Sequence, residues 1–161
     1  KTQRMNIKLI VIGKSEEKYL REAVEIYLKR LTHYINFEIV VLPDVKNAKN
    51  MSVAELKDKE AELILKHSAK ADKVVLLDEK GKEYSSVEFS KYLTKQMNAS
   101  VKTLAFVVGG AFGFSEKVYS QANEKLSISK MTFSHQMIRL LFVEQLYRAF
   151  TIIKGEPYHN E

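Results

Sequence analysis

The chain has no cysteine among its 161 residues. This absence excludes disulfide bonds, thiolate nucleophiles and cysteine-based zinc or iron–sulfur sites, and it agrees with a reducing compartment. The spacings H-x-x-x-H and H-E-x-x-H, which bind zinc from one face of a helix, are missing as well. The histidines of the chain are His33, His67, His135 and His159. We therefore expect no metal site.

Long apolar runs are also missing. No stretch approaches the roughly 20 apolar residues that cross a bilayer, and the N-terminus lacks the apolar core of a signal peptide. With 2 prolines and 45% hydrophobic residues, the chain has the composition of a globular protein of one domain. We expect a cytoplasmic protein without membrane contact. We also expect residues 1–4 to be an expression scar and the single domain to span residues 5–161.

Several common enzyme motifs are absent. The sequence contains neither the P-loop pattern G-x-x-x-x-G-K-[ST] nor the hydrolase pattern G-x-S-x-G. Its first apolar run ends at a lone Gly13, where a dinucleotide-binding fold would carry G-x-G-x-x-G. The net charge of +6 favours a polyanionic partner, but an excess of this size is common in proteins that bind no nucleic acid.

Short apolar runs alternate with helical patterns five times along the chain. The runs predict strands at residues 5–12, 37–42, 74–77, 103–108 and 126–129. Serines stand where helix N-caps are expected, at Ser15, Ser52, Ser85, Ser115 and Ser134. This alternation predicts an α/β fold with a mainly parallel sheet and helices on both of its faces.

The fourth apolar run ends in a glycine-rich loop that contains Gly109, Gly110 and Gly113. Open parallel sheets bind ligands at the carboxyl ends of their strands, and glycines let backbone amides approach a ligand closely. A cofactor site at this loop therefore makes physical sense. An ordinary turn into the helix that follows Ser115 explains the same glycines.

The last helix, expected from Ser134 to Lys154, is apolar almost all round. Such a helix is buried on more than one side, which in a short chain points to a second subunit. Arg139 projects into its main apolar face, where an unpaired charge is costly. In a purely structural role, Arg139 would extend past the helix start to solvent or meet a buried acid. In a functional role, it would line a site or a dimer interface.

Two further places could carry chemistry. His135 begins the last helix, where a neutral imidazole could orient a substrate or move a proton, or could simply bond the backbone. Tyr158 and His159 lie in what would ordinarily be a frayed tail. Beside a basic helix, this pair could instead stack on a nucleobase and hydrogen-bond to it.

The last third of the chain resembles a known family. The stretches that carry the resemblance are GGAFGFS, SISKMTFSHQ, RLLFVEQLYRAF and the terminal PYH. They resemble the SPOUT-superfamily methyltransferases that modify pseudouridine in large-subunit ribosomal RNA, and the likeness runs in order from MNIKLIVIGK to the tail. The resemblance implies an α/β knot with a C-terminal trefoil and a homodimer. It also implies S-adenosylmethionine as methyl donor and transfer to N3 of pseudouridine.

The resemblance also assigns residues. It implies contact with the cofactor by Leu77, Gly109, Ile128, Ser129, Lys130, Met131, Thr132 and Phe133. It implies substrate binding or catalysis by His135, Arg139, Arg148, Tyr158 and His159. The sequence departs from the family pattern at Ser134, where proline is usual, and at Asn160, where a basic residue is frequent. These departures put the rigidity of one loop and one phosphate contact in doubt.

Two other functions would share the basic charge and the glycine loop. One is a nucleotide- or RNA-binding α/β module without catalysis. The other is a small-molecule transferase, which would have a closed pocket in place of a basic open face. The methyl transfer that the resemblance implies needs no metal, and its partner is ribosomal RNA or the ribosome.

Overall fold

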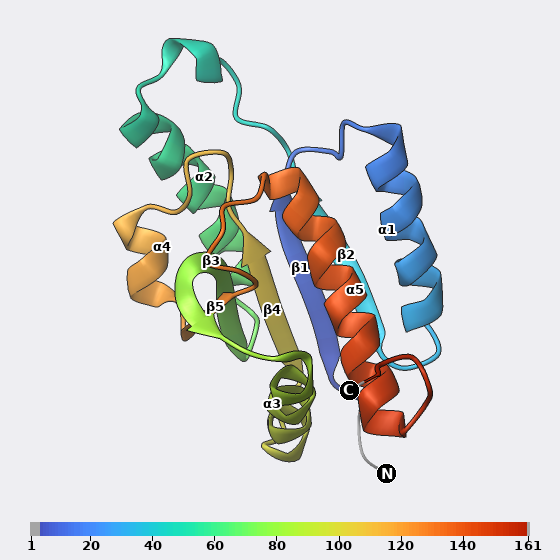
Figure 1. Ribbon diagram of the computed structural model, residues 1–161. Helices are drawn as coiled ribbons and strands as arrows, with labels where there is room; N and C mark the ends of the chain where they lie inside the picture. Colours follow the sequence, from blue (N-terminus) through green and yellow to red (C-terminus); the bar gives the residue numbers. More distant parts are fainter. Residues whose placement is uncertain (1–3, 161) are drawn as a thin grey trace.

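The chain folds as an open α/β sheet in the computed structural model, which describes residues 4–160 (Figure 1). The strands are β1 (Asn6–Ile12), β2 (Asn36–Leu42), β3 (Lys73–Glu83), β4 (Thr103–Val108) and β5 (Glu124–Ser127). The helices are α1 (Lys18–Leu31), α2 (Val53–Ser68), α3 (Ser86–Asn98), α4 (Glu116–Gln121) and α5 (His135–Lys154), with a 3₁₀ turn at Ala48–Asn50. Of the expected expression scar at residues 1–4, residues 1–3 lie outside the described residues and Arg4 lies within them.

The sheet has the strand order β2-β1-β4-β3-β5, and every pair of neighbours is parallel. The predicted α/β class with a mainly parallel sheet is therefore confirmed. The knotted path of the C-terminal segment stays a prediction of the resemblance. Within the described residues, no helix is both long and apolar enough to cross a membrane.

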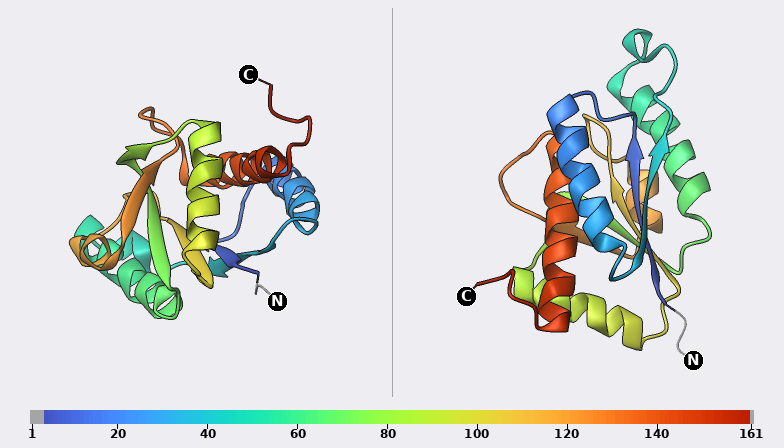
Figure 2. Two further views of the ribbon diagram at one scale, coloured as in Figure 1. Left: turned by 90° about the horizontal axis from the view of Figure 1, so that it is seen from below. Right: turned by 90° about the vertical axis from the view of Figure 1, so that its right-hand side faces the viewer.

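Helices cover both faces of the sheet, as the alternating pattern predicts (Figures 1 and 2). Alternate residues of β1 point to opposite faces because the side-chain period of a strand is two. Leu9 and Val11 pack in one core cluster with α1, α3 and α5, and Ile10 and Ile12 pack in the other with α2 and α4. A parallel sheet buried on both faces reads as a continuous apolar run, which is what MNIKLIVI is.

The helix termini follow the predicted caps with one exception. Ser52 and Ser85 each form a capping box, and Ser134 caps α5, which ends at Gly155 in the left-handed conformation. The prediction for Ser15 was wrong, because α1 begins three residues later and Glu17 precedes it without a side-chain cap. The carbonyl of Ser15 instead accepts a hydrogen bond of 2.9 Å from Arg21 Nη1, which keeps this serine in the loop after β1.

Strand β3 is longer than the apolar run VVLL indicates. It continues through a polar segment to Glu83, with an irregular register against β5 between Leu77 and Lys82. Gly81 permits this close pairing, since a Cβ there would lie 2.6 Å from the carbonyl carbon of Lys125. The bulged segment 78–81 has the composition of a turn, which is why the sequence predicts that the strand stops at Leu77.

The chain leaves β1 and β4 on opposite faces of the sheet. α1 follows β1 on one face, and α4 follows β4 on the other. Two adjacent parallel strands with this arrangement form a topological switch point, and ligands of open α/β sheets bind in the crevice at its carboxyl edge. The edge formed by the ends of β1, β4 and β3 is therefore the place to look for a site.

Candidate active site

A cavity of about 740 Å³ opens at the carboxyl ends of β3 and β4. Most of its walls come from three segments: the bulge of β3, the glycine loop after β4, and the loop between β5 and α5. Helices α2, α4 and α5 contribute further lining residues. The lining includes Leu77, Asp78, Glu79, Gly109, Gly110, Gly113, Phe114, Ile128, Ser129, Met131, Thr132, Phe133 and His135. A cavity of this size accommodates a ligand the size of a nucleoside cofactor.

Seven of the eight residues assigned to the cofactor line this cavity. They are Leu77, Gly109, Ile128, Ser129, Met131, Thr132 and Phe133. Lys130 is not among the lining residues; its ammonium is largely exposed and lies 3.6 Å from a carboxylate oxygen of Glu83. Whether Lys130 contacts a cofactor stays a prediction.

Short polar contacts fix the loop between β5 and α5. The Thr132 hydroxyl donates to Glu79 Oε2 at 2.6 Å, which ties the loop to the bulge of β3. The Ser129 hydroxyl accepts from the backbone N–H of Met131 at 3.0 Å. Met131 and Phe133 remain exposed at the rim, with 75% and 40% of their residue surface accessible to solvent. The loop is thus held in place while it presents apolar groups to solvent.

The glycine loop has the turn that the sequence predicts, and it also borders the cavity, while its contact with a cofactor stays a prediction. It leads into α4, where the Ser115 hydroxyl accepts from the N–H of Val118 at 3.4 Å, and it also forms a wall of the cavity. A Cβ at Gly109 would lie 3.2 Å from the ring of Phe114, which is tighter than ordinary van der Waals contact. Any side chain at Gly109 would therefore crowd Phe114 at the cavity wall.

Arg139 does not reach solvent and forms no ion pair within residues 4–160, and its guanidinium lies against the end of β1. The residue is only 2% exposed, and its Nη2 donates to the carbonyl of Ile12 at 2.6 Å. A second, longer bond of 3.4 Å joins Nη1 to the Ser15 hydroxyl. The buried Nε has no hydrogen-bond partner among the described residues. Arg139 thus holds the carboxyl end of β1 in place, and its Nε–H is left without an acceptor among residues 4–160.

His135 lies one turn before Arg139 and lines the cavity. Its buried Nδ1 has no hydrogen-bond partner among the described residues. Burial, followed by the nearby positive charge of Arg139, lowers the pKa of His135, while Glu16 and Asp44 act in the opposite direction. A lowered pKa keeps the imidazole neutral near pH 7, so its free nitrogen can accept or donate one hydrogen bond.

We expect Arg139→Met to destabilise the protein by about 1–3 kcal/mol, because the carbonyl of Ile12 loses its donor while it stays buried. Denaturant unfolding of both proteins gives the difference. Lys14→Met is a matched control, since Lys14 is an exposed cation in the loop after β1 that Arg139 contacts. Equal stability of wild type and Arg139→Met would contradict the structural role assigned to this arginine.

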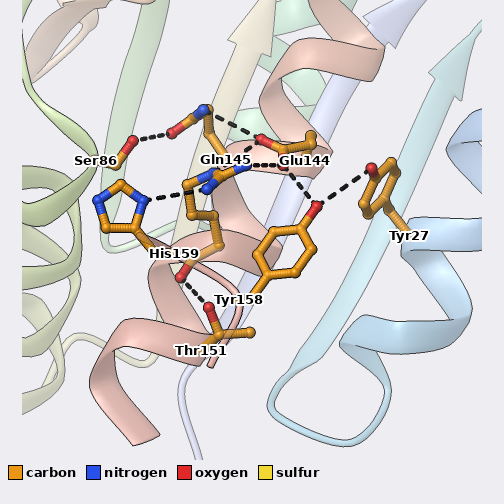
Figure 3. Close-up of polar contacts among 8 residues, drawn as sticks. Tyr27, Ser86, Glu144, Gln145, Thr151, Tyr158 and His159 are labelled. Carbon is orange, nitrogen blue, oxygen red and sulfur yellow. Dashed lines mark hydrogen bonds and ion pairs between the residues drawn. The ribbon is translucent and has the colours of Figure 1, made fainter. Parts of the chain in front are cut away.

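The tail is not frayed, because it packs against the last turns of α5 (Figure 3). The Tyr158 hydroxyl donates to Glu144 Oε2 at 2.8 Å, and Arg148 Nη2 lies 2.7 Å from the same oxygen. Arg148 Nη1 lies 3.1 Å from His159 Nδ1, and its guanidinium covers the Tyr158 ring. Burial and the hydroxyl of Tyr27 raise the pKa of Tyr158, so its hydroxyl stays protonated.

The five residues assigned to substrate binding or catalysis therefore form two groups. His135 lines the cavity, and Arg139 follows it one turn along α5 beside the end of β1. Arg148, Tyr158 and His159 form a second group nearer the C-terminal end of α5. Thirteen residues of helix separate His135 from Arg148, which corresponds to about 20 Å at 1.5 Å per residue. Within one chain, the second group does not reach the cavity.

Sequence reasoning missed Glu144, which joins Arg148 to the tail. Its carboxylate accepts from both Arg148 and Tyr158, and Tyr27 of α1 lies 3.5 Å from the Tyr158 hydroxyl. The spacing of Glu144 and Arg148, four residues apart on a helix, could have indicated this pair. No local pattern indicates the contact with Tyr27, which depends on how α1 packs on α5.

Comparison with known proteins gives one family and several close relatives. Residues 5–159 match the family described as "Predicted SPOUT methyltransferase". The chain is 61% identical over 157 residues to "Ribosomal RNA large subunit methyltransferase H" of Parabacteroides distasonis, which covers 98% of this chain and 100% of that protein. It is 55% identical, with the same coverage, to the protein of that name from Flavobacterium johnsoniae.

Solved structures share the fold at low sequence identity. A probable methyltransferase from Bordetella pertussis superposes with a TM-score of 0.59 at 12% identity, covering 91% of this chain and 96% of that one. A probable methylase family protein from Haemophilus influenzae gives 0.57 at 13% identity, covering 100% and 72%. These likenesses support the fold alone.

Proposed function

The chain belongs to the SPOUT methyltransferase family, and from this premise we propose that it methylates large-subunit ribosomal RNA. The methyl donor is S-adenosylmethionine and the acceptor is N3 of a pseudouridine. The observation that carries the substrate class is the identity of 51–61% over nearly the full chain with proteins named ribosomal RNA large subunit methyltransferase H. The donor and the acceptor atom follow from the resemblance of the last third of the chain.

The cavity fits such a donor. Its apolar walls include Leu77, Ile128 and Phe114, which suit a purine and a thioether chain. Asp78, Glu79 and Glu116 also line it, and acidic groups complement the ammonium and sulfonium charges of the donor. Tyr119 holds Asp78 through a short hydrogen bond from its hydroxyl, so this carboxylate is fixed beside the cavity.

When bound, S-adenosylmethionine would supply a methyl group already activated by the sulfonium. The protein then has to hold the imide nitrogen in line with that group and to dispose of its proton. Leu77, Gly109 and the loop 128–133 would hold the donor. His135, neutral and with a free Nδ1, would orient the base from the cavity edge.

We further propose that the active unit is a cytoplasmic homodimer. Arg148, Tyr158 and His159 lie about 20 Å along α5 from the cavity of their own chain. The tail can therefore serve the reaction only at the cavity of a partner. Leu140, Leu141 and Ile152 remain partly exposed on α5 and supply an apolar surface for such packing. Sedimentation at micromolar concentration is expected to give a dimer.

Incubation with methyl-labelled S-adenosylmethionine, with and without ribosomes, tests the function. We expect label in ribosomal RNA only when ribosomes are present. Binding of the donor without transfer to any RNA would support a non-catalytic binding module. Label in small molecules of a ribosome-free extract would support a small-molecule transferase. No metal is added, and among the described residues no group of three or more histidines, aspartates or glutamates is placed to bind one.

A further inference from the structure

The loop between β2 and α2 projects from the same edge of the sheet as the cavity. Residues 43–52 connect the two elements, whereas connections of this kind usually have about two to six residues. The loop rises beyond the carboxyl ends of the strands, and in both side views it extends farther than any other segment at that edge (Figures 1 and 2). Long loops of compact domains usually carry a function, so this loop is a candidate for one.

The loop is held by contacts of its own. Asn47 adopts the left-handed conformation, with φ of 60°, and starts the 3₁₀ turn Ala48–Asn50. The backbone N–H of Asn50 donates to the carbonyl of Asn47 at 3.0 Å. At the end of the loop, Ser52 forms the capping box of α2. A loop that is ordered in this way loses little conformational entropy when it binds a partner.

The charge of the loop is entirely positive. Lys46 and Lys49 are the only ionisable side chains in residues 45–54. Both lysines are exposed, and no ion pair or side-chain hydrogen bond joins either of them to another group of residues 4–160. The loop therefore presents two cations whose charge the described part of the chain does not neutralise.

The carboxylates at the two ends of the loop are engaged elsewhere. Asp44 lies against the turn after β1, since a Cβ at Gly13 would lie 2.6 Å from Asp44 Oδ1. Glu55 Oε1 accepts from the Ser52 hydroxyl at 3.1 Å and from the Ser52 backbone N–H at 3.4 Å, as its place in the capping box requires. Neither carboxylate forms an ion pair with a lysine of the loop.

The loop leads directly to the cavity. It continues into α2, whose second turn contributes Lys57 to the cavity lining. Lys57 is half-buried and, like the loop lysines, has no ion-pair partner within residues 4–160. Only four residues, about 6 Å of helix, separate Val53 at the start of α2 from Lys57. We call residues 45–57 the basic arm, because its lysines extend from the cavity wall to the tip of the loop.

The charge inside the cavity has the opposite sign. Asp78, Glu79 and Glu116 line it, and these acidic groups suit the positive charges of the proposed donor. The same groups repel phosphates. An RNA nucleotide that enters the cavity brings negatively charged phosphates on both of its sides. Cations outside the acidic interior are therefore needed to hold the strand while a single base is inserted.

We propose that the basic arm binds RNA phosphates that flank the target nucleotide, with Lys46 and Lys49 as the contacts. This inference rests on the proposed function and names how its RNA substrate is held. Phosphate contacts fix the position of a nucleic acid and do not read its sequence. The arm therefore contributes to the affinity for the substrate and leaves the chemical step to the groups in the cavity.

The first test is the double variant Lys46→Gln, Lys49→Gln, which removes both charges at similar side-chain length. We expect KM for ribosomes to rise about five- to tenfold, the range for two exposed ion pairs, with kcat within about twofold of wild type. The affinity for S-adenosylmethionine, measured by calorimetry, stays within about twofold. The matched control is Lys95→Gln, Lys102→Gln, which removes two exposed charges near the amino end of β4, at the opposite edge of the sheet.

A second readout does not depend on methyl transfer. Binding to ribosomes is measured by co-sedimentation at several salt concentrations, and the logarithm of the binding constant is plotted against that of the salt concentration. Each phosphate contact with a single strand contributes about 0.7 to the steepness of this line. We expect a line less steep by about 1.4 for the double variant Lys46→Gln, Lys49→Gln. Lys46→Arg, Lys49→Arg keeps both charges and is expected to keep the wild-type slope.

The outcomes separate this inference from the proposed function. Wild type that binds ribosomes with a slope that depends on the arm, but transfers no label, contradicts the methyl transfer and supports the arm as an RNA contact. Active wild type with KM and slope unchanged in the glutamine variant overturns the role of the arm alone. A higher KM with an unchanged slope also overturns it, because the arm would then contact a partner other than phosphate. Equal losses in the control pair overturn it as well, since net charge would explain them.

Discussion

Deletion of residues 158–161 is expected to lower methyl transfer by about 100-fold while the affinity for S-adenosylmethionine stays within about twofold. Tyr158 and His159 are held near the far end of α5 by Glu144 and Arg148, away from the cavity of their own chain. A tyrosine that stacks on a base contributes about 1–3 kcal/mol, and each 1.4 kcal/mol is a factor of ten. Loss of the ring and the imidazole together accounts for the expected factor.

Calorimetry and a transfer assay on the same preparation measure both quantities. Removal of residues 160 and 161 alone is the matched control, since it leaves the pair Tyr158 and His159 in place. Full activity of the longer deletion would mean that the tail plays no part in the reaction. Loss of donor binding would mean that the tail supports the cavity and does not act on the RNA.

Gly109→Val is expected to weaken the binding of S-adenosylmethionine at least about tenfold, which corresponds to 1.4 kcal/mol, and to leave the protein folded. The valine side chain would project toward the ring of Phe114, where even a Cβ is 3.2 Å away, and would narrow the cavity. Calorimetry measures the affinity. Ala99→Val is the control, because Ala99 is exposed and is not among the residues that line the cavity. Unchanged affinity in a folded Gly109→Val would place the donor elsewhere.

The two variants together test the dimer. A mixed dimer of Gly109→Val and the tail deletion contains one intact cavity, in the deleted chain, and one intact tail, in the valine chain. If each tail serves the cavity of its partner, mixing the two inactive proteins restores part of the activity. If each tail serves its own chain, the mixture stays as inactive as its components.

The sequence predicts the features of this fold that depend on short-range patterns. Ser52, Ser85 and Ser134 cap their helices as expected, because the donors that they satisfy lie within three residues. The bulged extension of β3 could not be predicted, since its polar residues resemble a turn and its pairing depends on β5, more than 40 residues away. Ser15 fails as a cap because contacts of Arg21 and Arg139 hold it in the loop after β1.

The residues of the candidate site divide in the same way: local patterns indicate some of them, and the others depend on contacts between distant parts of the chain. The glycine loop and His135 are visible as local patterns beside strand and helix ends. Glu144 is visible only in part: its spacing to Arg148 is a local pattern, but its contact with Tyr158 depends on how the tail folds back along α5. The role of Arg139 depends in the same way on the position of Ile12, 127 residues earlier in the chain.

The measurement that tests the proposed function most directly is mass spectrometry of nucleosides from ribosomal RNA after transfer from methyl-labelled S-adenosylmethionine. We predict that the label is found in N3-methylpseudouridine, and that it is absent when Gly109→Val replaces the wild-type protein. Label in methyluridine, in a ribose-methylated nucleoside or in no nucleoside of the large subunit would contradict the assignment.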